Sequence, residues 1–595
     1  MKIKINILII SFVVALAFFL RIYKISNIPP SLNWDEVSLG YNAYSVLKTG
    51  KDEWGKILPV IFTAYGDYKL PGYIYTLVPF ISIFGLNAFA IRLPSVLAGT
   101  ITVLFTYLTV LELFSNNQLN QKEKRNVLNH DFISEGKINI VAFTASLLVV
   151  IEPWSLFLSR PAFEANLALC FFVIAVYLFL RSIHTIKYLP PSILFFGLTV
   201  WTYNSYRIFT PLFIVFLTIL YRKELLFAIK TKQQIIFNVF LFILLFLPMF
   251  YQLLIGVGQE RYQKVAIVDE GAVGQIVNLR NKYSLNPLLE KLFFNRPVYF
   301  TGSFIKNWIT FYSDKFLYSQ GGTNYQFSVP GFGLLYPINI IFLVIGIIYL
   351  FVKRANKSSM VLLFIFLMGS IPSSLTRESP HVLRSITLLP SPAIITAIGA
   401  VNFFIWFQKN ERLTLIRRFV RLFFIPLTIV VYLLFLGQAF GKYYSYYLNE
   451  YPKEYSWSWQ YGYREAVNYI KDNYDNFDKI IVTKKYGEPH EFVLFYLSWN
   501  PQNYFNSSNL IRFRQTDWFW VDRFDKFYFV NDWDIPTEEW QPFVLESEKE
   551  EVDCRGINCL LITSPGNVPK GWSKLQTINY LNCQPVYEIY DNKQN

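Results

Sequence analysis

The sequence predicts an α-helical membrane protein that spans the bilayer many times and carries an α/β domain after its last span. First, 53% of the 595 residues are hydrophobic and 16% are charged, whereas soluble domains carry roughly 25% charged residues. Second, the mean hydropathy is positive, at +0.31. Third, long apolar runs recur through the first 440 residues and then stop. A single soluble core is therefore excluded.

About eleven apolar runs are expected to be spans, given that a spanning helix needs about 20 mostly apolar residues and that the ranges given below mark where the runs centre. The first run follows Lys2 and Lys4 and resembles a signal peptide. Its apolar continuation and the many later spans favour an uncleaved anchor. The expected spans centre on residues 7–25, 88–113, 138–156, 166–182, 189–203, 209–221, 234–254, 333–352, 359–372, 385–407 and 419–440.

The basic residues predict the orientation of the chain. With a cytoplasmic N-terminus, the inner connections are "NQKEKRNV", "RSIHTIK", "YRKELLFAIKTK", "VKRANKS" and "QKNERLTLIRR". Each is rich in Lys and Arg, as cytoplasmic loops are. An odd number of spans then places the C-terminal domain on the extracytoplasmic side. The whole chain is expected to be a multi-pass protein of the cell (plasma) membrane.

Three stretches are expected on the outer face: residues 26–87, 255–332 and 441–595. The first contains "YKLPGYIYTLVPFISIFG", which is apolar but short and broken by prolines, so an interfacial helix is expected there. The residues after Asp35 and Glu36, "VSLGYNAYSVLKTG", predict a short amphipathic helix. We divide the chain into a membrane domain, residues 1–440, and an extracytoplasmic domain, residues 441–595.

The C-terminal domain differs from the rest in charge and pattern. Residues 441–595 hold 16 Lys and Arg against 22 Asp and Glu, a net charge of −6, and the remaining residues carry +20. "DKIIVTKKYGEPHEFVLFYLSWN" predicts a strand, a turn and a helix, and "NCLLITSPGN" and "DKFYFVNDW" predict buried strands. Three cysteines there, Cys554, Cys559 and Cys583, permit at most one internal disulfide. The sequence contains no dense tract of Lys and Arg that would predict nucleic-acid binding.

Ionisable side chains gather at the expected outer ends of the spans, where they are costly and indicate function. Arginine and lysine bind phosphate oxygens strongly, and a carboxylate nearby can deprotonate an attacking hydroxyl. The pattern predicts a site for an anionic, membrane-embedded substrate, although single arginines of this kind also anchor helix ends. The residues are Asp35, Glu36, Asp67, Lys69, Arg92, Arg160, Glu164, Arg207, Arg377, His381 and Arg384.

Several of these stretches resemble the bacterial branch of glycosyltransferase family 39, the dolichyl-phosphate-mannose–protein mannosyltransferase-like enzymes of the GT-C superfamily, to which aminoarabinose lipid A transferases are related. The resemblance runs through "NWDEVSLGYNAYSVLKTGKDEWG", "YKLPGYIY", "IRLPSVLAGTITVLFTYL", "PWSLFLSRPAFEAN" and "SPHVLRSITLLP". It implies a GT-C type fold and a polyprenyl-phosphate sugar as donor.

The resemblance also implies roles for matched residues. Asp35 corresponds to the acid proposed to activate the acceptor, with Glu36 beside it in the catalytic pair. Lys69 and Arg92 correspond to positive charges near the donor phosphate, as do Arg377 and Arg384. The remaining ionisable residues are possible substrate contacts. Aminoarabinose transferases have an arginine three residues after the acid, where this chain has Ser38, which leaves the acceptor open.

The predicted function is transfer of a sugar from a polyprenyl-phosphate donor to an acceptor hydroxyl on protein, lipid or glycan, outside the cytoplasm. Asp35 would be the general base. Some relatives bind a divalent metal, but the sequence offers no clear ligand set, so no cofactor is assigned. The alternatives are a flippase for lipid-linked glycans, an oligosaccharyltransferase- or ligase-like enzyme, and a non-catalytic assembly subunit. Charges at span ends and the lack of a visible repeat argue against a transporter.

Overall fold

The computed structural model describes residues 2–66, 68–119, 135–254, 264–268, 270–283, 286–353, 356–409, 423–516, 518–547 and 549–593. The chain forms two compact units. The first comprises Met1–Tyr23, Ser95–Ser159 and Phe163–Tyr444, and the second Lys24–Pro94, Arg160–Ala162 and Ser445–Asn595. The outer loop after the first span thus folds together with the C-terminal domain, which the sequence had not indicated.

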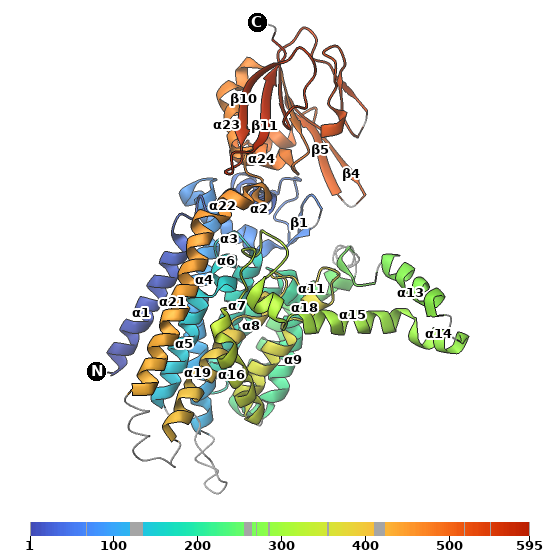
Figure 1. The fold of residues 1–595 in the computed structure, drawn as a ribbon. Coiled ribbons are helices and arrows are strands. Elements are labelled where there is room, and N and C mark those ends of the chain that lie inside the picture. The colour runs from blue at the N-terminus through green and yellow to red at the C-terminus, as the bar shows by residue number, and fades with distance from the viewer. Residues whose placement is uncertain are drawn as a thin grey trace. The chain divides into compact units, whose positions relative to one another are not determined.

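The first unit is a bundle of apolar helices (Figure 1). Seven of the described helices are long and apolar enough to cross a membrane, and there are five shorter apolar helices, one of which, Pro71–Phe84, belongs to the second unit. Each of the expected spans falls on one of these helices, apart from residues 419–422, which lie outside the described residues. The predicted fold class, a polytopic helical membrane protein with a C-terminal α/β domain, is confirmed.

The helices of the first unit are α1 (Lys2–Ile22), α4 (Ala88–Leu119, which begins in the second unit), α5 (Glu135–Ile151), α6 (Pro153–Leu158), α7 (Glu164–Ser182), α8 (Leu189–Val200), α9 (Asn204–Leu220), α10 (Arg222–Ala228), α11 (Lys232–Leu254), α13 (Glu270–Tyr283), α14 (Pro287–Phe293), α15 (Arg296–Thr310), α16 (Ile340–Val352), α17 (Lys357–Met368), α18 (Ile371–Ser374), α19 (Ser391–Lys409) and α21 (Ile425–Asn449, which ends in the second unit). Helices α13, α14 and α15 extend away from the bundle (Figure 1).

Close helix packing in the bundle depends on small residues. A Cβ atom on Gly399 of α19 would lie 1.8 Å from the carbonyl oxygen of Phe342, and one on Gly346 of α16 would lie 2.1 Å from that of Ile395. Only glycine permits this approach, as is common where membrane helices meet. Phenylalanines fill the space between other helices, with the rings of Phe172 and Phe213 centred 5.2 Å apart.

The second unit is built around a seven-stranded sheet with the order β10–β11–β9–β3–β6–β5–β4. Strand β3 lies at its centre, parallel to β6 and β9, and the outer pairs are antiparallel. The strands predicted from the sequence are confirmed as β3, β6 and β9. The bounds are β3 (Lys479–Thr483), β4 (Ile511–Gln515), β5 (Trp518–Phe524), β6 (Phe527–Val530), β9 (Cys559–Thr563), β10 (Ser573–Asn579) and β11 (Pro585–Asp591), with a separate pair β7 (Phe543–Val544) and β8 (Glu551–Val552).

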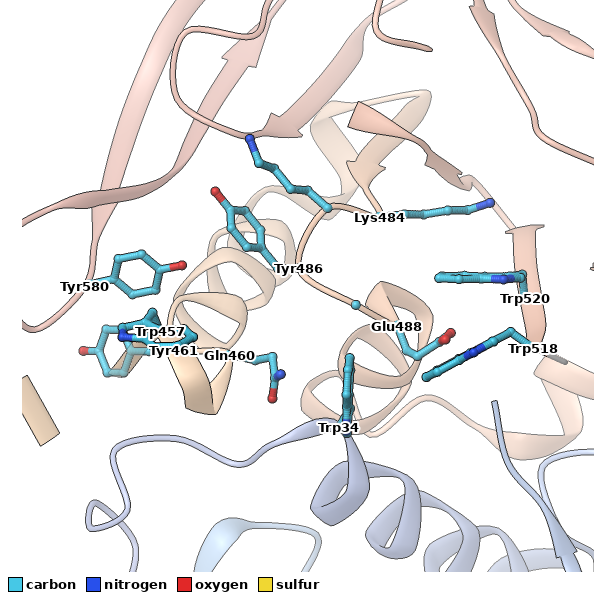
Figure 2. A pocket seen from close by; sticks show the side chains of 12 residues that line it. Trp34, Trp457, Gln460, Tyr461, Lys484, Tyr486, Glu488, Trp518, Trp520 and Tyr580 are labelled. Atoms are coloured by element: carbon cyan, nitrogen blue, oxygen red, sulfur yellow. The ribbon is translucent and has the colours of Figure 1, made fainter. Parts of the chain in front are cut away.

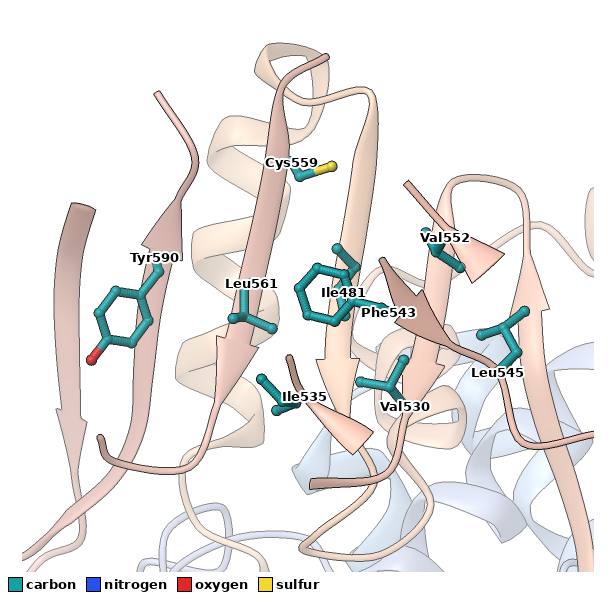
Figure 3. Packing of buried hydrophobic residues seen from close by; sticks show 9 residues of the cluster. All are labelled: Ile481, Val530, Ile535, Phe543, Leu545, Val552, Cys559, Leu561 and Tyr590. Carbon is teal, nitrogen blue, oxygen red and sulfur yellow. The ribbon is translucent and has the colours of Figure 1, made fainter. Parts of the chain in front are cut away.

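Both faces of the sheet are covered. One face carries a buried cluster around Ile481, Val530 and Leu561, into which Phe543 packs from β7 (Figure 3). On the other face, Tyr463 of α23 (Tyr463–Asn473) stacks on Phe492 of α24 (Pro489–Tyr496), with ring centres 4.0 Å apart. Alternation of side chains along each strand permits this double burial. A disulfide joins Cys554 to Cys559, and Cys583 is a free, exposed thiol.

The remaining elements of this unit come from the first outer loop and the start of the C-terminal domain. They are α2 (Trp34–Thr49), the hairpin β1 (Phe62–Thr63) and β2 (Tyr68–Lys69), α3 (Pro71–Phe84), α22 (Tyr451–Tyr455) and α25 (Pro501–Phe505). Helix α2 was expected to be amphipathic, but this prediction was wrong because ten of its 16 residues are buried. Packing against α3 and α24 covers it.

Candidate functional site

The N-terminus of α2 holds the two adjacent acids in different environments. Asn33 caps the helix: its side chain accepts a hydrogen bond from the Glu36 N–H at 2.9 Å, and Glu36 Oε2 accepts one from the Asn33 N–H at 3.2 Å. This reciprocal pairing satisfies two otherwise unpaired donors of the first turn. It fixes the turn so that Glu36 faces the interior and Asp35 remains 32% exposed at its side chain.

Asp35 lies beside two donors from the β1–β2 hairpin. The Tyr65 hydroxyl donates a hydrogen bond to Asp35 Oδ1 at 2.6 Å, and the Lys69 ammonium forms an ion pair with the same oxygen. Burial, with the charge of Asp35, raises the pKa of Tyr65 well above its usual value. Tyr65 therefore stays protonated and donates to the carboxylate. The structure brings together Asp35 and Lys69, both expected site residues, and adds Tyr65.

Glu36 and Arg92 form a fully buried ion pair. Arg92 Nε donates to Glu36 Oε1 at 2.8 Å, and its Nη2 donates to Oε2 at 2.9 Å. Glu36 Oε1 also accepts from the Ala162 N–H at 2.9 Å. Neither side chain of the ion pair reaches solvent. This environment fits a residue that positions α2, and not a group that touches substrate.

The expected role of Arg92 as a donor-phosphate ligand does not fit the structure. Beyond its bonds to Glu36, its Nη1 donates to the carbonyls of Ile25 at 3.0 Å and Pro29 at 2.9 Å, and its Nη2 donates to that of Ser31. All five N–H groups of the guanidinium are thereby engaged. The residue fixes the chain that leads from the first span into α2.

The other expected substrate contacts are distributed over both units. In the second unit, Arg160 is fully buried, donates to the Ile28 carbonyl at 3.0 Å and lies over the Tyr447 ring at 5.3 Å. Asp67 falls outside the described residues. In the first unit, Glu164 begins α7 and is partly buried, and Arg207 of α9 is buried and donates to Gln252 Oε1 at 2.9 Å.

The loop before α19 groups three further expected residues in the first unit. His381 Nδ1 accepts from the Arg384 N–H at 3.2 Å. Arg384 is ion-paired with Glu378 at 3.1 Å, and Arg377 is exposed and donates to the Lys264 carbonyl at 2.6 Å. The loop thus holds two guanidinium groups, one of which is paired with a carboxylate. A role of these residues beside Asp35 stays a prediction, because they belong to the other unit.

A pocket of about 470 Å³ opens in the second unit next to Asp35. Trp34, the residue before Asp35, lines it together with Trp518 and Trp520 of β5. The rings of Trp34 and Trp518 each lie near that of Tyr65, with centres 5.7 Å and 5.6 Å away. Figure 2 shows these tryptophans facing Tyr486 and Tyr580 across the pocket. This aromatic wall was not predicted from the sequence, although the tryptophan-rich segment "DWFWVD" indicates it.

A second group of acids that the sequence analysis missed is buried in the same unit. Burial raises the pKa of Glu53 to about 7. Burial, with the charge of Glu53, raises the pKa of Glu491 well above its usual value. Burial likewise raises the pKa of Glu488. Burial, assisted by Arg512, lowers the pKa of His490 to about 3. The sequence "GEPHE", between a strand and a helix, was the signal for these groups.

The Glu53 carboxyl makes stability depend on pH. Unfolded glutamate has a pKa of 4.5 and folded Glu53 one of about 7, so the folded chain binds more protons between these values and loses stability as the pH rises through 7. We expect a loss of about 1 kcal/mol from this carboxyl between about pH 6.5 and 8. His490 opposes that loss in the lower part of the window, because unfolded histidine has a pKa of 6.5 while the folded imidazole is already neutral. Thermal unfolding of the purified protein at several pH values measures it. Glu53→Gln should flatten this slope, and an unchanged slope in that variant would remove Glu53 as its source.

Among the residues that the structure describes, no group of three or more His, Cys, Asp or Glu side chains is placed to hold a metal ion. Divalent-metal binding, for which the sequence offers no clear ligand set, stays untested.

Residues 11–118 match the family model described as dolichyl-phosphate-mannose-protein mannosyltransferase. This confirms, over that segment, the resemblance drawn from the sequence, and the segment contains Asp35, Glu36, Lys69 and Arg92. No curated protein matches the chain.

Two solved structures are similar to this chain. One is ArnT from Cupriavidus metallidurans bound to undecaprenyl phosphate, with 11% identity, coverage of 99% of this chain and 98% of that one, and a TM-score of 0.49. The other is the archaeal oligosaccharyltransferase AglB from Archaeoglobus fulgidus in complex with an inhibitory peptide and a dolichol-phosphate. It shares 13% identity, with coverage of 83% of this chain and a TM-score of 0.45. This chain spans 64% of the length of that oligosaccharyltransferase.

Proposed function

We propose that this protein is a membrane glycosyltransferase that transfers a sugar from a polyprenyl-phosphate donor to an acceptor hydroxyl on the extracytoplasmic face. The observation that carries the proposal is the group formed by Asp35, Tyr65 and Lys69. A partly exposed carboxylate lies there beside an ammonium group, within the segment that matches the mannosyltransferase family model. The multispan fold supports a lipid-borne substrate.

Asp35 is suited to act as the general base. Its carboxylate takes the proton of the acceptor hydroxyl as that oxygen attacks the anomeric carbon of the sugar. The bond between the anomeric carbon and the phosphate oxygen breaks, and polyprenyl phosphate leaves with the electron pair. Attack and departure occur on opposite faces, so the configuration at the anomeric carbon is inverted. The Tyr65 hydrogen bond holds the carboxylate in place for this transfer.

Lys69 is suited to neutralise the donor phosphate. Its ammonium, 13% exposed at the side chain, carries the positive charge nearest to Asp35 among the expected site residues. Asp35 loses its charge when it takes the acceptor's proton, so the ion pair then no longer offsets the charge of Lys69. At that moment negative charge develops on the departing phosphate, and a fixed cation stabilises it. Glu36 and Arg92 position α2 and do not touch the substrates.

The proposal is tested by comparing lipid-linked sugars in cells with and without the gene. Loss of the transferase should cause one polyprenyl-phosphate monosaccharide to accumulate, because its consumption stops. Mass spectrometry of the extracted lipids identifies the sugar and so the donor. Reintroducing the wild-type chain should remove the accumulated lipid, and reintroducing Asp35→Asn should not. Unchanged lipid-linked sugars in the deletion strain would contradict the proposal.

A further inference from the structure

The walls of the pocket beside Asp35 combine flat aromatic faces with polar groups. Trp518 and Trp520 lie nearly parallel, with ring centres 6.1 Å apart and planes 29° apart. The Lys484 ammonium lies 5.5 Å from the centre of the Trp520 ring and helps to hold it. Figure 2 shows Trp34 and Gln460 along one side of the opening, with Tyr486 opposite. The volume of about 470 Å³ lies within the range of about 300–1,000 Å³ typical of small-molecule sites.

Two buried polar groups that line this pocket lack hydrogen-bond partners within the protein. Both carboxyl oxygens of Glu488 are unpaired, although the side chain is fully buried. The Oε1 atom of Gln460 is unpaired too. The Nδ1 atom of His490 lies 3.5 Å from Oε2 of Glu488. Burial lowers the pKa of His490 and so keeps this imidazole neutral. Leaving a buried carboxyl unpaired is unfavourable, and a ligand with hydroxyl groups would offset that cost.

The two lysines that line the pocket are already paired with carboxylates. Lys484 Nζ lies 2.6 Å from Asp522 and 3.1 Å from Glu546, and Lys485 Nζ lies 3.2 Å from Asp532. Their charges are therefore neutralised, and an anionic group gains little there. The pocket favours an uncharged ligand that has both apolar faces and several hydroxyl groups.

We propose that this pocket binds a sugar residue of a glycan acceptor, so that the acceptor hydroxyl belongs to a carbohydrate. The C–H face of a pyranose ring would lie on Trp518 or Trp520, and its hydroxyls would pair with Glu488 and Gln460. Trp34 lines the pocket and immediately precedes Asp35, so a glycan seated there places a neighbouring hydroxyl toward the base. This inference rests on the proposed function, because it identifies the acceptor class of the same site.

Glu488→Leu separates binding from folding. Replacing an unpaired buried carboxyl by an apolar side chain of similar size is expected to be neutral or favourable for stability. The same change should raise the half-saturating concentration of the glycan acceptor about tenfold, the equivalent of 1.4 kcal/mol. Trp520→Ala is a second, independent variant with the same expectation. Trp533→Ala is the matched control, because Trp533 is 80% exposed and does not line the pocket.

The assay uses the full-length protein, a radiolabelled polyprenyl-phosphate sugar, and membrane extract from a strain that lacks the gene. Labelled products are separated into glycan, lipid and protein fractions. We expect label in the glycan fraction. The half-saturating concentration of the acceptor should be higher for Glu488→Leu and Trp520→Ala than for the wild type. Label only in protein or lipid, or unchanged saturation in both variants, overturns the proposal.

A binding measurement distinguishes failure of this inference from failure of the proposed function. Tryptophan fluorescence of Asp35→Asn protein, which should not turn over, is titrated with the polysaccharide fraction of the same strain. Saturable quenching that Glu488→Leu weakens supports the glycan site even if wild-type protein transfers no sugar. Transfer by the wild type without any quenching contradicts the glycan site and leaves the transferase intact.

Discussion

Replacing Asp35 by Asn is expected to lower the rate of sugar transfer by about 10²–10⁴-fold, the usual contribution of a positioned general base. The amide has nearly the same shape and can still accept the Tyr65 hydrogen bond at its oxygen, but it cannot take the acceptor's proton. Because Asp35 is 32% exposed, the fold should survive the change. The purified variant is assayed for transfer at saturating donor and acceptor.

Asp472→Asn is the matched control for this variant, because Asp472 is an exposed acid of α23 in the same compact unit. It should transfer sugar at the wild-type rate. Thermal unfolding of both variants shows whether any loss of activity reflects misfolding. Transfer by Asp35→Asn within about twofold of the wild-type rate would exclude Asp35 as the base, since a positioned base contributes far more than that.

Replacing Arg92 by Met is expected to destabilise the second unit by about 3–5 kcal/mol, because it leaves the Glu36 carboxylate buried without its partner. It also removes the bonds that fix the backbone at Ile25, Pro29 and Ser31. For a unit of this size the apparent Tm should fall by about 6–20 °C. Thermal unfolding in detergent, followed by tryptophan fluorescence, measures the shift.

The Tm values of two further variants show whether the unpaired Glu36 carboxylate causes that shift. The double variant Arg92→Met with Glu36→Leu should recover part of the lost stability, because no buried charge remains unpaired. Arg377→Met, which changes an exposed arginine, should alter the Tm little. A normal Tm for Arg92→Met combined with weakened donor binding would restore the phosphate-binding role that the sequence suggested.

The spans and strands could be predicted from the sequence because they depend on local patterns. Apolar length defines a membrane helix whatever its neighbours are, and the runs around Ile481, Phe529 and Leu561 have the β-branched and aromatic content of strands. Helix α2 shows the limit of such reasoning. Its polar positions looked exposed, but α3 and α24 cover them, and sequence spacing does not reveal that contact.

The candidate site was predictable only in part, for the same physical reason. The family pattern identified Asp35 and Lys69, although they are 34 residues apart. It could not show that all N–H groups of the Arg92 guanidinium donate hydrogen bonds to Glu36 and three carbonyls, because those bonds form only on folding. Nor could it show that Trp518 lies near Trp34, with ring centres 6.2 Å apart, because long-range packing joins segments that are far apart in the chain.

The most direct test of the central claim follows the donor itself. Purified full-length protein in lipid nanodiscs is incubated with a radiolabelled polyprenyl-phosphate sugar and membrane acceptor, and the label is measured in lipid and acceptor fractions. Our account predicts that label leaves the lipid and appears in the acceptor with wild-type protein, and stays on the lipid with Asp35→Asn. Label that remains on intact lipid with the wild type, or that only moves across the bilayer in proteoliposomes, would contradict a transferase and favour a flippase.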